Sequence, residues 1–133
     1  MKAKKTINCT GVFSDTIRKK ANPELFSRLL GAKGTHLILD IPFCKNGKGM
    51  IIPKTRDGRL MFVLPYSGAP DKYTLLGTTD EAAEIEYGIK HTQSDIDYLL
   101  EEFSFYVNEE TKSKLHDSVV SAWTGLRPLV LEK

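Results

Sequence analysis

Residues 49–65 read Gly-Met-Ile-Ile-Pro-Lys-Thr-Arg-Asp-Gly-Arg-Leu-Met-Phe-Val-Leu-Pro, and this stretch decides the fold. Two short apolar runs, 49–53 and 60–65, lie on either side of the pair Asp57-Gly58. An Asp-Gly pair supplies the positive-φ positions that a tight reversal of the chain needs. The two runs are therefore predicted to pair as an antiparallel hairpin.

Further short runs extend the predicted sheet beyond this hairpin. Each is rich in apolar or β-branched residues and is bounded by Gly, Pro, Asn or Asp. These predicted strands are 35–39, 73–79 and 117–123, with a short additional strand at 5–11. The loop at 67–72 indicates a second hairpin, and 124–128 is predicted to form a turn because it contains Gly125 and Pro128.

Two helices are predicted beside these strands. The first covers 14–20, with Ser14 or Asp15 as its cap, and ends before Asn22-Pro23. The second begins near Ser94, whose hydroxyl is predicted to cap it. Apolar residues then recur at helical spacing and define one buried stripe. The stripe consists of Ile96, Leu99, Leu100, Phe103 and Val107.

Together these elements predict a single α+β domain of 133 residues, in which helices pack on an antiparallel or mixed β-sheet. The net charge is only +2 and basic residues are scattered, which argues against nucleic acid as a partner. No run approaches the roughly 20 apolar residues of a membrane span, and the start lacks the apolar core of a signal peptide. We therefore expect a soluble, cytoplasmic chain.

The chain contains few of the residues that commonly bind metals or form disulfides. Cys9 and Cys44 lack CxxC spacing, and two cysteines are too few for a disulfide framework or a zinc site. Both are predicted to be reduced and partly buried. His91 and His116 lie in polar surroundings and are predicted to be solvated, so no metal site is expected.

No motif for self-contained catalysis is present. The sequence contains no GxGxxG, no GxxxxGK[ST], no HExxH and no nucleophile elbow. The candidates for chemistry are therefore polar residues at the ends of predicted strands, and each has a structural alternative.

Arg127 stands between a predicted strand and Pro128, where its planar guanidinium suits the binding of a phosphate or carboxylate. A partly buried salt bridge is the alternative. His36 begins a strand and could serve as a hydrogen-bond partner or as an acid or base, or it could be a structural histidine. Thr79 and Asp80 end a strand that contains Gly77, which indicates either a close approach to a ligand or a hydrogen-bonded turn.

Five segments, taken in order, resemble one known family. They are Ile7-Asn8-Cys9-Thr10-Gly11, Gly34-Thr35-His36-Leu37, the run 57–65, Gly77-Thr78-Thr79-Asp80, and the run Trp123-Thr124-Gly125-Leu126-Arg127-Pro128-Leu129. Their order and spacing, with a helix between the last two, are similar to those of the FAD-dependent glycerol-3-phosphate dehydrogenases and oxidases. The resemblance covers nearly the whole chain, although Cys9, Val12 and Thr124 stand where the family usually has Ala, Pro and often Ser.

The resemblance implies that the chain is a fragment of a D-amino-acid-oxidase-like flavoprotein. Residues 1–133 would form its substrate-binding (cap) domain, with 5–20 a remnant of the end of the FAD-binding domain. FAD would be the cofactor of the full-length parent. It is not expected on this fragment, which lacks the Gly-rich turn and helix N-terminus that hold its phosphates. The parent would convert glycerol 3-phosphate to dihydroxyacetone phosphate by hydride transfer to flavin, whereas the isolated fragment is expected to be inactive.

The resemblance also implies roles for individual residues. Arg127 and His36 would be the catalytic pair and would contact the substrate, together with Thr79 and Asp80. Asn8, Thr10 and Gly11 would lie near the cofactor. The partners would be glycerol 3-phosphate and the missing FAD-binding and C-terminal segments, and the parent could be peripheral to the cytoplasmic face of a membrane. An uncovered sheet face would favour self-association.

Two alternatives remain open at this stage. The chain could be a free-standing, non-catalytic binding module, or a fragment of another flavin-dependent amine or hydroxyacid oxidase. The sequence also leaves open whether a quinone or oxygen accepts the electrons.

Overall fold

The computed structural model describes residues 3–131 and, among these, every side chain except that of Lys45. The strands are β1 (Leu29–Leu39), β2 (Met50–Ile52), β3 (Met61–Pro65), β4 (Thr74–Gly77), β5 (Glu81–Ala83) and β6 (Val119–Val130). The helices are α1 (Ser14–Ala21), α2 (Gln93–Ser104) and α3 (Glu109–Lys112), with 3-10 turns η1 (Gly11–Phe13), η2 (Lys45–Gly47) and η3 (His116–Ser118).

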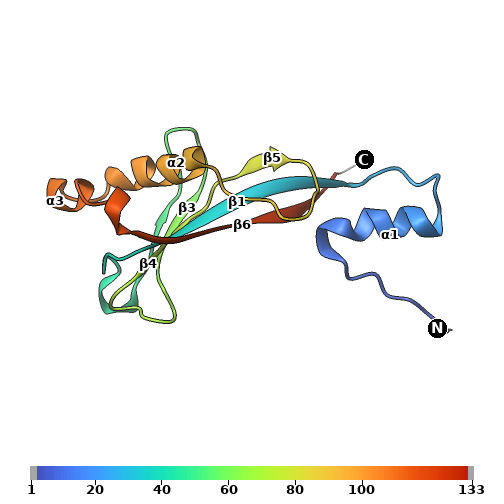
Figure 1. Ribbon diagram of the computed structural model, residues 1–133, viewed down its shortest axis with the longest axis horizontal. Helices are drawn as coiled ribbons and strands as arrows, with labels where there is room; N and C mark the ends of the chain where they lie inside the picture. Colours follow the sequence, from blue (N-terminus) through green and yellow to red (C-terminus); the bar gives the residue numbers. More distant parts are fainter. Residues whose placement is uncertain (1–2, 132–133) are drawn as a thin grey trace.

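All described strand pairs are antiparallel, which confirms the predicted α+β class and selects its antiparallel form. The sheet is ordered β2-β3-β4-β1, and β6 pairs along the other edge of β1. β5 pairs with the first half of β1, on the same edge that β4 uses further along. The long β1 and β6 ribbon runs through the length of the molecule, with α3 near one end and α1 near the other (Figure 1).

The hairpin that the Asp-Gly pair predicts is present. β2 and β3 pair antiparallel, with Ile51 opposite Phe62. Gly58 has φ +89°, a conformation that L side chains rarely adopt, and Thr55 and Arg59 bond across the reversal. The second predicted hairpin is also present, because β3 and β4 pair antiparallel.

The core lies between one face of the sheet and α2. Leu37, Leu39, Met61, Val63 and Leu76 point to this face and are fully buried. They pack against three residues of the predicted stripe on α2, namely Leu99, Leu100 and Phe103, so the stripe is confirmed. Ile96 and Val107 also pack against the core, but they are only partly buried. Val107 lies beyond the end of α2.

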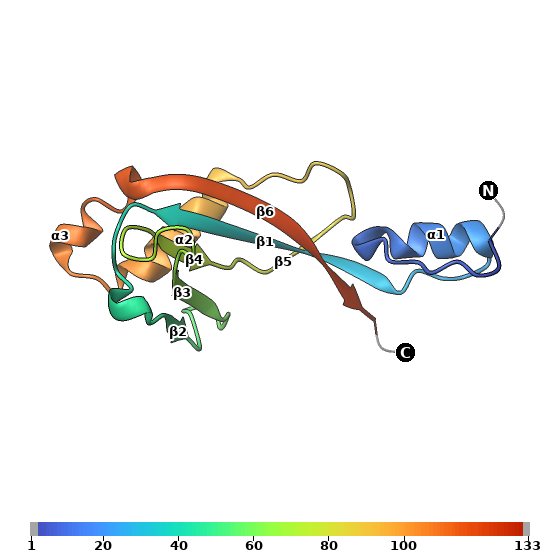
Figure 2. The ribbon, with the colours of Figure 1, turned by 90° about the horizontal axis from the view of Figure 1, so that it is seen from below.

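The opposite side of the sheet, which we call the open face, presents large apolar side chains without a covering helix. Directly paired residues project to the same side of a sheet, and residues two apart on a strand do likewise. By that register the open face includes Leu30, Ile51, Phe62, Leu64, Trp123 and Leu129. All of these except Phe62 are among the exposed large hydrophobic residues. Figure 2 shows the sheet from the side opposite to α2.

Several sequence-based predictions of strand limits are wrong, among them the start of β1, which is Leu29 and not residue 35. Residues 5–10 form no strand, and Ile7 is 85% exposed. The side chain of Asn8 instead accepts hydrogen bonds from the backbone and hydroxyl of Thr10, a local alternative to strand pairing. Residues 124–128 are not a turn but part of β6, where Pro128 is tolerated because an edge strand has a partner on one side only.

The caps of the two longer helices also differ from prediction. α1 covers the predicted residues, but its cap position is Phe13 without a side-chain bond. Asp15 is buried and accepts hydrogen bonds from the amides of Arg28 and Leu29, which tie the helix to the start of β1. α2 is capped by Thr92 rather than Ser94, in a reciprocal capping box with Asp95.

The remaining expectations concern cysteines and membranes. Cys44 is buried, whereas Cys9 is exposed, so the prediction of partial burial is wrong for Cys9. Burial raises the pKa of the Cys44 thiol. Among residues 3–131, no helix combines the length and the apolar character that crossing a bilayer requires.

Candidate functional site

His36 and Arg127 project to the same face of the sheet, the open face. His36 pairs with Trp123, and Arg127 pairs with Ala32, four residues earlier on β1. His36 and Ala32 are an even number of residues apart on β1, so they and their partners on β6 project to the same side of the sheet. The two residues that the sequence proposed separately therefore share a surface.

His36 is held between Trp123 and Gly77. Its ring stacks on Trp123, with centroids 5.4 Å apart and planes 10° from parallel. A Cβ at Gly77 would lie 2.3 Å from Cδ2 of the imidazole, so only glycine leaves room for the ring there. Burial, and then the positive charge of Arg127, lower the pKa of His36 below its usual 6.5. The imidazole is consequently neutral at pH 7 and able to accept a proton.

Arg127 is fixed by three consecutive residues between β4 and β5. Its Nη2 donates to Oγ1 of Thr78 at 2.6 Å, and its Nη1 donates to the carbonyl of Thr79 at 3.3 Å. Nη1 also pairs with the carboxylate of Asp80 at 3.2 Å. The salt bridge that the sequence left as an alternative is thus present, yet the Arg127 side chain remains 37% exposed. The guanidinium keeps further N–H donors for a ligand.

The guanidinium lies directly over Gly34. A Cβ at that position would come within 2.2 Å of Nη2. Gly34 therefore provides the space into which Arg127 folds.

Arg127 lines a hollow of about 450 Å³ beside the open face. Thr78 and Asp80 line it from the loop after β4, and Phe62 and Leu129 supply apolar surface. Arg59 also lines it, from the loop before β3. His36 does not line this hollow, so His36 and Arg127 share a face but not a single enclosed cavity.

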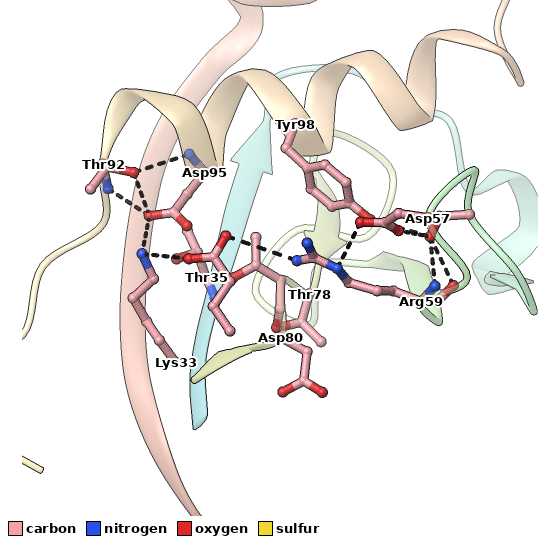
Figure 3. Close-up of polar contacts among 12 residues, drawn as sticks. Lys33, Thr35, Asp57, Arg59, Thr78, Asp80, Thr92, Asp95 and Tyr98 are labelled. Carbon is pink, nitrogen blue, oxygen red and sulfur yellow. Dashed lines mark hydrogen bonds and ion pairs between the residues drawn. The ribbon is translucent and has the colours of Figure 1, made fainter. Parts of the chain in front are cut away.

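The side chain of Thr79, unlike those of Thr78 and Asp80, does not bond to Arg127. Its side chain is fully buried, and its hydroxyl accepts a hydrogen bond from the amide of Thr35 at 2.9 Å. It reaches Arg127 only through its backbone carbonyl. Asp80 is exposed, and its carboxylate points away from α2 (Figure 3).

A set of alternating charges on the α2 side of the sheet was not anticipated from the sequence. Lys33 pairs with Asp95 at 2.9 Å and with Glu81 at 3.1 Å. Arg59 lies 3.9 Å from Glu81 and 2.8 Å from Asp57. We call these five residues the charge ladder, and Figure 3 labels Lys33, Asp57, Arg59 and Asp95 among them. Its members are up to 62 positions apart, so no local pattern could have indicated it.

The ion pair between Lys33 and Asp95 is the most buried part of the charge ladder. The Asp95 side chain is 1% exposed and that of Lys33 is 12% exposed. The hydrogen bond to Asp95 raises the pKa of Lys33 above its usual range. Burial alone would raise the pKa of Asp95, but hydrogen bonds from Thr92 and Lys33 lower it. Both groups are therefore charged at neutral pH.

Asn8 and Thr10 lie in the segment that leads into η1 and α1, and Gly11 is the first residue of η1, a turn that contacts β6. Asn8 donates to the carbonyl of Ser14 at 2.9 Å and accepts from Thr10, so its polar groups are used locally. Gly11 has φ +56° and open space around it. The open face is apolar beside His36 and Arg127, where Trp123 and Leu129 are exposed.

The described residues hold no group of three His, Cys, Asp or Glu side chains placed to bind a metal ion. His91 and His116 are both exposed.

Comparison with known proteins agrees with this geometry. The chain matches, over residues 1–133, the family described as FAD dependent oxidoreductase. It is 36% identical over 131 residues to a probable mitochondrial glycerol-3-phosphate dehydrogenase of Caenorhabditis elegans, covering 98% of this chain and 18% of that protein. It is 34% identical over 130 residues to the mitochondrial glycerol-3-phosphate dehydrogenase SDP6 of Arabidopsis thaliana, covering 98% of this chain and 20% of that protein.

A solved structure shares the fold. It is the glycerol-3-phosphate dehydrogenase of Bacillus halodurans complexed with FAD, with a TM-score of 0.81 and 31% identity. The match covers 99% of this chain and 26% of that chain. The chain thus spans about a fifth of the length of the curated relatives it matches.

These comparisons confirm the resemblance that the five segments suggested, and FAD is the cofactor by which the matched family is described. Since that family is matched along all 133 residues, this chain belongs to the FAD dependent oxidoreductases.

Proposed function

We propose that this chain forms the substrate-facing sheet of an enzyme that oxidises glycerol 3-phosphate to dihydroxyacetone phosphate. Its relatives and its structural neighbour are named glycerol-3-phosphate dehydrogenases. The observation that carries the proposal is the placement of His36 and Arg127 on one open face, where burial and then the charge of Arg127 lower the pKa of His36 and keep the imidazole neutral.

Arg127 would bind the phosphate of the substrate. Its guanidinium is oriented by Thr78, Thr79 and Asp80 but is still more than a third exposed, so it offers fixed donors to an anion. Fixing one end of a small molecule also fixes the position of its reacting carbon, which lowers the entropic part of the barrier.

His36 would accept the proton of the substrate hydroxyl at C2. A neutral imidazole is the form that can act as a base, and the lowered pKa supplies that form at pH 7. FAD, when bound, supplies the acceptor for the hydride. Trp123 and Gly77 keep the ring in position for this transfer of the proton.

Residues 5–20 would be the remnant of the FAD-binding domain, with Asn8, Thr10 and Gly11 near the cofactor, and the rest the substrate-binding domain. By itself the chain would neither hold FAD nor turn over substrate. Asp80 would contact the substrate through the hollow it shares with Arg127. Thr79 would act through its carbonyl, because its hydroxyl is buried.

We propose, from the sequence alone, a cytoplasmic location with the full-length parent peripheral to the cytoplasmic face of a membrane. The names of two curated relatives, both mitochondrial proteins, do not support this location. Cell fractionation of the tagged parent tests this inference, and a mitochondrial matrix pattern would contradict it.

The test of the function uses Arg127→Met in the FAD-loaded parent. Loss of a hydrogen-bonded charge at a binding site should reduce kcat/KM for glycerol 3-phosphate roughly 100-fold. Arg28→Met is the matched control, because Arg28 is exposed in the segment before β1 and should leave kinetics unchanged. Unchanged turnover in Arg127→Met would refute the proposed role.

A further inference from the structure

The orientation of Arg127 depends on a short segment that belongs to no strand. All three acceptors of its guanidinium come from residues 78–80, which connect β4 to β5. A displacement of this segment would move every one of these acceptors together. What fixes residues 78–80 therefore determines where the positive charge of Arg127 lies.

Thr79 anchors the middle of this segment to β1. Its amide donates to the carbonyl of Thr35 at 3.3 Å, and its hydroxyl accepts from the amide of Thr35. Thr35 is in turn bonded through its hydroxyl to Thr124 of β6, at 2.6 Å.

The far end of the segment continues into β5, which is a weak strand by itself. It has only three residues, two of them exposed, and pairs with β1 alone among the described strands. A three-residue edge strand offers few ladder hydrogen bonds. Side-chain contacts of β5 must therefore contribute much of what holds it in register.

Glu81, the first residue of β5, supplies these contacts. Its carboxylate lies 3.1 Å from Nζ of Lys33 and 3.9 Å from Nη1 of Arg59. Lys33 is fixed by Asp95, which belongs to the capping box of α2. Arg59 stacks on Tyr98 of the same helix. Glu81 is thus tied to α2 from two sides, directly after the residues that orient Arg127.

We propose that Glu81 is a positioning residue for Arg127: through Lys33 and Arg59 it anchors residues 78–80 to α2 and so sets the place of the guanidinium on the open face. The proposal deepens the function proposed above, because it names the device that positions the anion-binding group. Glu81 is directly opposite Lys33, which contacts Asp95 of α2, so the Glu81 side chain lies on the α2 side of the sheet and needs no contact with substrate.

The test measures the pKa of His36 by NMR titration of the 133-residue chain, because this pKa reports on the nearby charge of Arg127. Glu81→Gln removes a negative charge, whose direct electrostatic effect is to lower the pKa of His36. If Arg127 moves away, the pKa of His36 instead rises, by roughly half a unit. The sign of the change therefore separates positioning from simple charge removal.

Glu84→Gln is the matched control. It makes the same charge change three residues later, and Glu84 is exposed and takes part in no ion pair found among residues 3–131. We expect it to leave the pKa unchanged or slightly lower. When Arg127 is already replaced by Met, Glu81→Gln should no longer raise the pKa of His36.

Equal shifts in Glu81→Gln and Glu84→Gln, or a rise that persists without Arg127, would overturn the proposal. Circular dichroism checks that each variant is folded. If Glu81→Gln does not fold, Glu81→Asp, which keeps the charge on a shorter side chain, is titrated instead, with the same rise expected. The titration needs no substrate, so it can succeed even where the parent fails to oxidise glycerol 3-phosphate.

Discussion

Gly34 decides whether Arg127 can fold onto the sheet. A Cβ at this position would overlap the end of the Arg127 side chain, which is flexible and can move aside. Gly34→Ala should therefore leave the fold intact but displace the guanidinium. We expect kcat/KM of the FAD-loaded parent for glycerol 3-phosphate to fall roughly tenfold or more, because misplacement by about 1 Å is costly.

Gly125 provides the control for this substitution. It faces Gly34 directly across the β1 and β6 pair, but a Cβ there would meet nothing within 4 Å. Gly125→Ala should retain normal kinetics. Equal losses in the two variants would indicate a general effect on the strand pair and not on Arg127.

His36 gives the folded chain a dependence of stability on pH. Its pKa is lower in the folded state than the value of about 6.5 expected for the unfolded chain. Above pH 6.5 this contribution is fully present, and it is lost as pH falls through the folded pKa, because the unfolded chain binds the proton more readily. Urea unfolding at several pH values should show this loss, and His36→Gln should flatten that part of the curve.

The sequence predicted His36 and Arg127 as candidate site residues, but it did not predict the residues that hold them in place. Arg127 could be selected because it precedes Pro128 at the end of a predicted strand, and His36 because it begins one after Gly34. Thr78 and Arg59, which line the hollow with Arg127, also follow glycines, but nothing in their local sequence links them to Arg127. Their roles depend on contacts between residues far apart in sequence, which local patterns do not encode.

At the scale of elements, the N-terminus of α2 is held by a cap that the sequence misassigned. Thr92 accepts a hydrogen bond from the amide of Asp95, whose carboxylate accepts from the Thr92 amide in return. Thr92→Ala should destabilise the chain by about 1 kcal/mol in urea unfolding. Ser94→Ala, at the residue predicted as the cap, should change stability by less than about 0.5 kcal/mol.

If Ser94→Ala destabilised the chain more than Thr92→Ala, the prediction that Ser94 caps α2 would be correct. Both Thr92 and Ser94 are good caps by residue type and lie two positions apart, so propensity alone could not choose between them. The choice depends on where the chain enters the helix. Asp95 decides it, because it serves the capping box and Lys33 at once.

Strand limits were predicted well where burial alternates and poorly where it does not. β3 and β4 lie within the predicted runs, and their residues alternate toward the core. β1 begins six residues before the predicted start, because 29–34 contains two glycines and a lysine and lacks an apolar pattern. Its pairing with β6 is a tertiary effect that overrides these local preferences.

At the scale of the whole molecule, the sheet is covered on one side only. α2 buries the core face, whereas the open face presents Leu30, Ile51, Leu64, Trp123 and Leu129 to solvent. Family membership and a length of about a fifth of the curated relatives are consistent with a face that other parts of a larger enzyme would cover. In the isolated chain, apolar surface of this kind favours association.

We therefore predict that the purified chain self-associates through the open face. Sedimentation velocity over a range of concentrations should show a rising average mass, since burying apolar surface stabilises a complex by about 25 cal/mol per Å² before the costs of association. Leu64→Gln combined with Leu129→Gln should shift the equilibrium toward monomer, because both side chains lie on that face. Phe105→Gln is the matched control, because Phe105 is exposed at the end of α2, away from the open face. A chain that stays monomeric at high concentration, or a Phe105 variant that dissociates as readily as the double variant, would rule out the open face as the site of association.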